Sequence, residues 1–153
     1  MPDSIFSAAT EDETAALAAS LAAKARPGDV ILLAGPLGAG KTVFARGFIR
    51  ALAGDPTLEI PSPSFTLVQI YETTAAKIWH FDLWRLDGPG GLAELGCDDA
   101  RRDVVLVEWP DRLAALTPPD ALRVVLQVAG EGRRVAELQG WAGRLAGLPG
   151  APA

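Results

Sequence analysis

The sequence is poor in the residues that build disulfides and structural metal sites. Its 153 residues include one cysteine, Cys97, and one histidine, His80. A single cysteine cannot form an internal disulfide, and together these two residues are too few soft ligands for a structural zinc ion. The scarcity excludes a disulfide scaffold, argues against zinc and indicates a reducing compartment.

Long apolar runs and an excess of basic residues are also missing. The longest uncharged apolar run begins at Val30 and meets Lys41 after about a dozen residues, which is too short to cross a bilayer. Fourteen Lys and Arg against nineteen Asp and Glu leave a net charge of −5, so no diffuse basic field is available to hold phosphate backbones. We therefore expect a soluble, cytoplasmic protein that enters no membrane and does not bind nucleic acid without a partner protein.

What the chain does contain is enough apolar material for one core. Hydrophobic residues make up 49% of the sequence, which predicts a single globular domain over residues 1–139. From Gly140 onward the sequence consists mostly of Gly, Ala, Leu and Pro, and we expect residues 140–153 to form a poorly ordered tail.

The first half of the chain carries clear helix and strand signals. Thr10 and Glu13 have the spacing of a capping box, which predicts a helix through about residue 25. Residues 30–34 are apolar at every position, as expected of a strand covered on both faces in a parallel sheet. Apolar residues then recur at helical spacing from residue 41 to about residue 53.

The second half reads mainly as strands. Two strand-like runs joined by a short link predict an antiparallel pair, and a late hairpin follows a further buried strand. The expected strands are 66–72, 77–84, 104–108, 121–128 and 133–138, with a short helix at 92–100. The whole pattern predicts an α/β protein: a three-layer fold of the P-loop NTPase kind, with a mixed central sheet and helices on both faces.

One motif carries chemistry. Residues 35–42 have the phosphate-loop spacing of glycine, four residues and then Gly-Lys-Thr, placed between a buried strand and a helix. Backbone amides turned inward by the glycines cradle a polyphosphate, while the lysine adds a point charge and the threonine hydroxyl coordinates Mg²⁺. The nucleotide-binding residues expected here are Gly35, Leu37, Gly38, Ala39, Gly40, Lys41, Thr42 and Val43.

Hydrolysis needs a carboxylate beyond this loop, and two candidates stand out. Glu108 ends a buried apolar run, as an acid does at the carboxyl edge of a parallel strand, although any strand needs a polar exit. Asp82 lies within an apolar segment and needs a partner, which is either a metal-bound water or a structural salt bridge. His80 shares a strand face with Asp82, yet a lone histidine is more often a packing residue.

The absence of asparagine favours ATP over GTP, because GTPases normally read guanine with an Asn-Lys-x-Asp loop. One match to the Asp-x-x-Gly switch pattern, at residues 87–90, is explained well enough by loop composition.

Four blocks of the sequence occur together: the phosphate loop at 35–42, Ser-Pro-Ser-Phe-Thr-Leu-Val at 62–68, His-Phe-Asp-Leu-Trp-Arg-Leu at 80–86, and Val-Glu-Trp-Pro at 107–110. This combination resembles the TsaE (YjeE) family of small bacterial P-loop ATPases. They occur in the family's order and spacing, and the resemblance runs from about residue 10 to residue 138. Ser64 replaces a usual threonine and Trp84 a usual tyrosine.

The resemblance implies an ATPase that serves the threonylcarbamoyladenosine modification of transfer RNA. It implies docking on the TsaB and TsaD proteins, contact with tRNA only through that complex, and ATP hydrolysis that resets the transferase between turnovers. The implied magnesium ligands are Thr42 and Glu108, and the implied acidic residue is Asp82. A switch loop falls on Ser62, Ser64, Phe65 and Thr66, a functional aromatic on Trp109, and adenine contacts on Thr10, Glu13, Arg133 and Arg134.

Two other functions remain compatible with the residues. A small-molecule kinase shares the phosphate loop and the size, and a nucleotide-gated assembly factor needs binding without hydrolysis. The stoichiometry of a complex, its docking face and self-association stay open.

Overall fold

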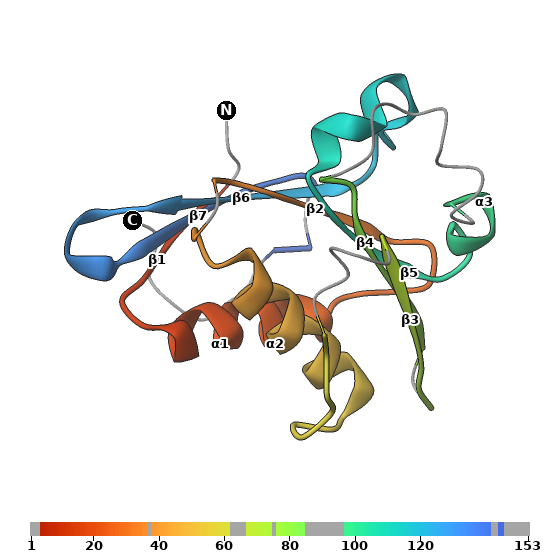
Figure 1. The fold of residues 1–153 in the computed structure, drawn as a ribbon, viewed down its shortest axis with the longest axis horizontal. Coiled ribbons are helices and arrows are strands. Elements are labelled where there is room, and N and C mark those ends of the chain that lie inside the picture. Colours follow the sequence, from red (N-terminus) through yellow and green to blue (C-terminus); the bar gives the residue numbers. More distant parts are fainter. Residues whose placement is uncertain are drawn as a thin grey trace.

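A computed structural model describes residues 4–36, 38–61, 67–74, 76–84, 97–141 and 144–145. Its centre is a seven-stranded sheet in the order β1-β7-β6-β2-β5-β4-β3 (Figure 1). The strands are β1 (Ser4–Ala8), β2 (Val30–Ala34), β3 (Val68–Glu72), β4 (Lys77–Asp82), β5 (Val104–Glu108), β6 (Leu122–Val128) and β7 (Arg134–Gln139).

The sheet is mixed, as the sequence predicts. Strands β6, β2, β5 and β4 run parallel, while β1, β7 and β3 pair antiparallel with their neighbours. All five positions of β5 are buried, and β2 is buried at four of its five, as expected for central strands covered on both faces. The phosphate loop follows the carboxyl end of β2, at the edge where β4 and β5 also end.

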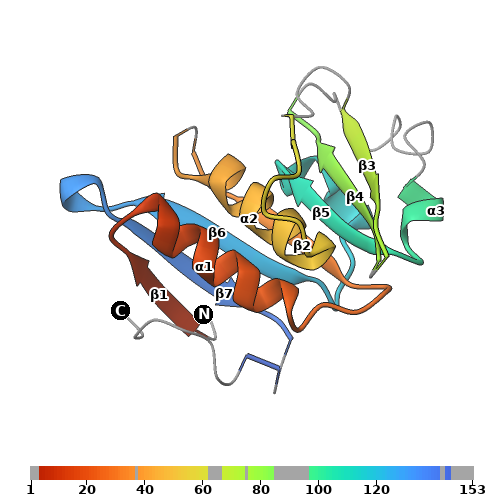
Figure 2. The ribbon, with the colours of Figure 1, turned by 90° about the horizontal axis from the view of Figure 1, so that it is seen from below.

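Two helices cover one face of this sheet. Helix α1 (Glu11–Ala22) and helix α2 (Lys41–Ala53) lie side by side across it (Figure 2). They pack closely where Gly47 meets Ala15, since a Cβ atom on Gly47 would lie 2.9 Å from the Ala15 Cα. Leu17, Leu21 and Phe48 are buried in this layer.

The opposite face is covered differently from the expectation of helices on both faces. Within the described residues, its cover consists of short elements: helix α3 (Cys97–Ala100) and the 3₁₀ helix η3 (Pro110–Leu116) (Figure 1). Ala100 and Leu113 from these elements pack against Leu32, Phe81 and Val107 of the sheet. The α/β class is therefore correct, but both longer helices lie in one layer.

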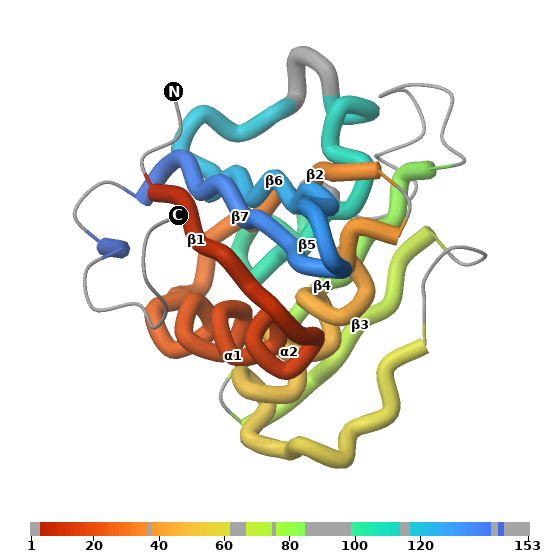
Figure 3. Tube along the Cα trace, turned by 90° about the vertical axis from the view of Figure 1, so that its left-hand side faces the viewer, coloured from red at the N-terminus to blue at the C-terminus, as the bar shows by residue number. Residues whose placement is uncertain are grey.

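Several element bounds differ from the predicted ones. Helix α1 ends at Ala22 rather than at residue 25, β4 ends at Asp82, and only residues 97–100 of the predicted 92–100 helix lie within the described chain. Strand β1 and helix η3 were not predicted. Strand β1 pairs with β7 at the edge of the sheet that faces the viewer in Figure 3.

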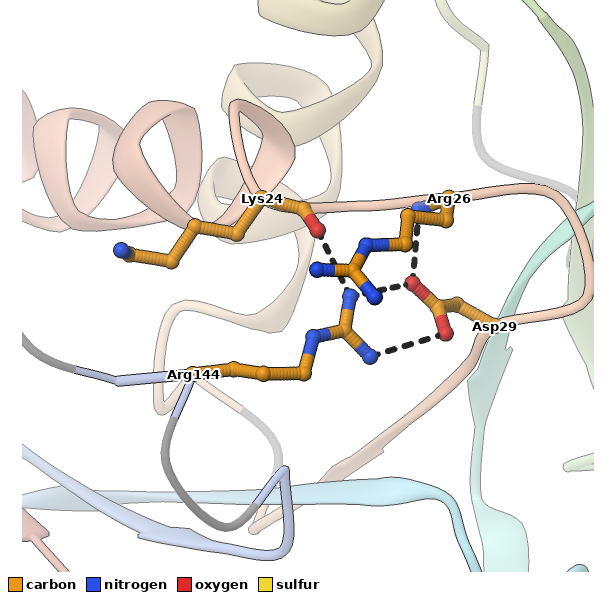
Figure 4. Close-up of polar contacts among 4 residues, drawn as sticks. All are labelled: Lys24, Arg26, Asp29 and Arg144. Atoms are coloured by element: carbon orange, nitrogen blue, oxygen red, sulfur yellow. Dashed lines mark hydrogen bonds and ion pairs between the residues drawn. The ribbon is translucent and has the colours of Figure 1, made fainter.

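The chain beyond β7 contacts the body of the protein. Trp141 is 5% exposed, and Arg144 donates to both carboxylate oxygens of Asp29, at 3.1 and 2.7 Å, and to the carbonyl of Lys24 at 2.6 Å (Figure 4). The Arg144 guanidinium also stacks over the Trp141 ring. These residues fall in the segment expected to be a poorly ordered tail. Residues 142–143 and 146–153 lie outside the described chain, so that expectation stays a prediction.

Candidate functional site

The loop between β2 and α2 has the backbone that a polyphosphate needs. Gly35, Gly38 and Gly40 have φ values of 140°, 79° and 102°, which side-chain-bearing residues rarely adopt. Gly40 is the N-cap of α2 and offers no capping side chain, so the first amides of the helix remain donors for an anion. Ala39 is fully buried beneath the loop.

Two carboxylates stand beside this loop because of strand register. Strands β4 and β5 are parallel neighbours, and their last residues, Asp82 and Glu108, are direct partners. Ile78 on β4 and Leu106 on β5 belong to the core on the helix-covered face, and alternation places both carboxylates on that same face. Asp82 is 4% exposed and Glu108 5%, which is unusual for charged groups unless they are paired.

Lys41 is the cation that faces them. Its ammonium donates to the Gly35 carbonyl at 2.7 Å and lies 3.5 Å from the centroid of the Trp109 ring. Burial lowers the pKa of Lys41 below its ordinary value, and the nearby charges of Glu108, Asp82 and Asp111 oppose that shift. The lysine is thus desolvated and held inside the site rather than extended into solvent.

Trp109 owes its place to a turn directly after β5. Its φ of 58° bends the backbone into the left-handed region, which is uncommon for a bulky residue. Its ring contacts that of Trp84, with centroids 4.4 Å apart. The two indoles form a wall beside the carboxylates.

These groups surround one cavity of about 510 Å³, a volume typical of small-molecule sites. Ten of the residues predicted from the sequence line it: Thr10, Gly38, Gly40, Lys41, Thr42, Val43, Asp82, Glu108, Trp109 and Arg134. Glu11, Thr14, Trp84 and Gly132 also line it and were not among the predicted site residues. Thr14 follows Thr10 by one helical turn, a spacing that places both on one face.

Other predicted residues are near the cavity without lining it. The Thr10 hydroxyl accepts from the Glu13 amide, as a capping box predicts, while the Glu13 carboxylate accepts from the amide of Ala9, one residue before the N-cap, at 2.9 Å. Arg133 donates to the Ser7 hydroxyl. Gly35, Ala39 and His80 are not among the lining residues. Leu37, Ser62, Ser64, Phe65 and Thr66 lie outside the described residues.

Arg134 joins the two sides of the site. Its guanidinium donates to the Gly38 carbonyl at 3.0 Å and to the Gly132 carbonyl at 2.8 Å. The β6–β7 hairpin is therefore tied to the phosphate loop, although about a hundred residues separate them in the sequence.

The oxygen atoms at one end of the cavity suit Mg²⁺. In the part of the chain that the structure describes, no three His, Cys, Asp or Glu side chains gather into a metal cluster. The Thr42 hydroxyl and the carboxylates of Asp82 and Glu108 nevertheless share this cavity. Mg²⁺ typically takes one or two protein oxygens and completes its shell with water and substrate phosphates, so this donor set fits the ion.

Comparison with known proteins gives consistent results. The family model "Threonylcarbamoyl adenosine biosynthesis protein TsaE" matches residues 8–136. The chain is 40% identical over 129 residues to a Rickettsia felis protein and 37% identical over 125 residues to a Bacillus subtilis protein, both named tRNA threonylcarbamoyladenosine biosynthesis protein TsaE. These alignments cover 84% and 80% of this chain, and 75% and 77% of the relatives.

A solved structure agrees in fold. The crystal structure of Bacillus subtilis YdiB superposes with a TM-score of 0.74 and 31% sequence identity, covering 90% of this chain and 86% of that one. Among the described residues, no helix has the length and apolar character to cross a membrane.

Proposed function

Because the chain belongs to the TsaE family and acts in tRNA threonylcarbamoyladenosine biosynthesis, we propose that it binds ATP with Mg²⁺ and hydrolyses it to drive that modification. The observation that carries the proposal is the convergence of the phosphate loop and two buried carboxylates on one cavity. A glycine-rich turn with a purely structural role has no need of two carboxylates at the same end of a cavity.

Each group at the phosphate end then has a role. Inward backbone amides of residues 35–42 hold the phosphate oxygens, and Lys41 leaves the Gly35 carbonyl to contact the outer phosphates. Thr42 and Glu108 hold Mg²⁺, which supplies charge neutralisation when bound. Asp82, one strand away, holds or polarises the attacking water.

Four further lining residues suit the nucleoside. They are Thr10, Thr14, Gly132 and Arg134, which come from the start of α1 and from the β6–β7 hairpin. We assign adenine and ribose contacts to these residues. The Ser62 to Thr66 segment connects α2 to β3, and we assign it the role of a switch that responds to the γ-phosphate.

The partners follow from the family and the charge. We propose that the chain docks on TsaB and TsaD, and that hydrolysis resets that complex between turnovers. A net charge of −5 supports contact with tRNA through the complex rather than directly.

The test measures phosphate release with and without TsaB, TsaD and tRNA. Glu108→Gln should lower turnover by at least about tenfold, while analogue binding in EDTA, which does not use the magnesium ligand, survives. Glu72→Gln is the matched control, because Glu72 is an exposed carboxylate on β3 that pairs with Lys77. ADP formation that requires a small acceptor and yields no free phosphate would favour a kinase. No turnover with all partners present would favour a nucleotide-gated assembly factor.

A further inference from the structure

The only histidine in the sequence lies directly beneath the proposed magnesium ligand. His80 Nε2 is 2.7 Å from Glu108 Oε2, and the two residues are 2% and 5% exposed. We propose that His80 is a positioning residue that fixes one carboxylate oxygen of Glu108 and so presents the other to the cation. This inference rests on the proposed function.

Strand register explains how the contact forms. His80 pairs with Leu106, and two residues further along each strand Asp82 pairs with Glu108. Residues two apart share a face, so His80 and Glu108 are diagonal neighbours across a parallel pair. Diagonal neighbours are within reach of long side chains. The contact is therefore set by two rigid central strands rather than by a loop.

The hydrogen bonds of the ring point to one purpose. Nδ1 is buried without a hydrogen-bond partner among the described residues, so the polar contact of His80 in this part of the chain is the one to Glu108. A carboxylate accepts only, which assigns the ring hydrogen to Nε2. If His80 served packing alone, an apolar residue in its place would make the protein more stable, because a buried nitrogen without a partner costs free energy of folding. The contact with Glu108 is therefore the reason we infer for a histidine at this position.

The consequence for Glu108 is a loss of rotational freedom. A glutamate has three side-chain torsions, and a carboxylate without a second contact samples several orientations. With Oε2 held by His80, Oε1 is left for the cation. Partners of this kind commonly change metal affinity or activity by about 10 to 100-fold when removed.

The test compares Mg²⁺-dependent nucleotide binding in matched variants of the full chain. Calorimetry gives the Kd of a non-hydrolysable ATP analogue in EDTA and in MgCl₂, and the ratio of the two is the magnesium enhancement. His80→Leu fills similar space without a donor, whereas His80→Gln keeps an N–H donor. Phe81→Leu is the control, because Phe81 is buried on the same strand but packs on the opposite face. Thermal unfolding verifies that each variant is folded, and His80→Ala replaces His80→Leu if the latter is not.

His80→Leu should reduce the magnesium enhancement about tenfold while the Kd in EDTA stays within about twofold. His80→Gln should restore most of the enhancement, and Phe81→Leu should keep it whatever its stability. A wild-type enhancement in a folded His80→Leu or His80→Ala protein overturns the inference and leaves the proposed function standing. A wild-type chain that binds no analogue, or binds it without regard to Mg²⁺, overturns the proposed function and this inference with it.

Discussion

Substituting Gly35 by alanine tests the geometry of the phosphate loop most directly. Gly35 has a φ of 140°, and a Cβ atom there would lie 2.3 Å from the backbone carbonyl oxygen of Leu126. That carbonyl belongs to the central strand β6, which cannot move aside as a flexible side chain does. The loop must therefore shift away from the sheet or the strand must bend.

The expected cost follows from two contributions. A non-glycine residue forced into a sparsely populated backbone region costs about 1–3 kcal/mol. Overpacking against rigid structure adds about 1–3 kcal/mol. A total of about 2–6 kcal/mol is a large part of the 5–15 kcal/mol that stabilises a typical domain. For a chain of this length it lowers Tm by about 4–24 °C.

Gly38 provides the matched control within the same loop. Its φ is 79°, but an added Cβ would meet nothing within 4 Å. Gly38→Ala should therefore cost only the backbone strain of about 1–2 kcal/mol, a fall in Tm of about 2–8 °C. Thermal unfolding of both variants without nucleotide, followed by circular dichroism, measures the difference. Equal stability of the two variants would refute the close approach of the loop to β6.

Three further predictions concern charge and packing. Nucleotide affinity should fall as the pH rises through the pKa of Lys41, which burial lowers from its ordinary value of 10.5, because the bound state requires the charged form. A series of Kd measurements at increasing pH up to 10.5 checks this. Arg144→Ala should lower the free energy of unfolding by about 1–3 kcal/mol through loss of the paired contacts to Asp29. Arg26→Ala should change it little, since Arg26 contacts Asp29 through its backbone amide. Urea unfolding of the two variants measures the difference. Gly47→Ala should destabilise by up to about 2 kcal/mol in the same assay, because its Cβ would meet the backbone of helix α1 at 2.9 Å. This net value is an overpacking cost of about 1–3 kcal/mol less a gain of about 1 kcal/mol in helix propensity.

Local sequence signals predicted the elements that glycines or capping residues delimit. Helix α2 has the predicted bounds because Gly40 and Gly54, both left-handed, flank it. Strand β1 was missed because its pairing partner is β7, far away in the sequence, and only Phe6 and Ala8 of it are buried. An edge strand with so short an apolar pattern leaves no local signal that distinguishes it from a loop.

The residues of the site likewise fall into those that local sequence signals predict and those that only the fold brings to the cavity. Lys41 and Thr42 come from a contiguous motif, and Glu108 from a strand that ends in a carboxylate, so sequence spacing identifies them. Gly132 and Thr14 reach the cavity only because the β6–β7 hairpin and helix α1 fold over the loop. Their contribution depends on tertiary packing, which a linear pattern does not encode.

The charges at the phosphate end link the fold to the choice of ligand. Asp82 and Glu108 are buried carboxylates that line the cavity together with Lys41, and the charges of both act on Lys41. At an effective dielectric constant of 20, two like charges 4 Å apart repel by about 4 kcal/mol. If the chain binds ATP as proposed, a free triphosphate would meet that repulsion, and a bound magnesium ion would offset it. The carboxylates that the sheet register places side by side should then disfavour free ATP and favour its magnesium complex, so removal of Mg²⁺ with EDTA should weaken analogue binding.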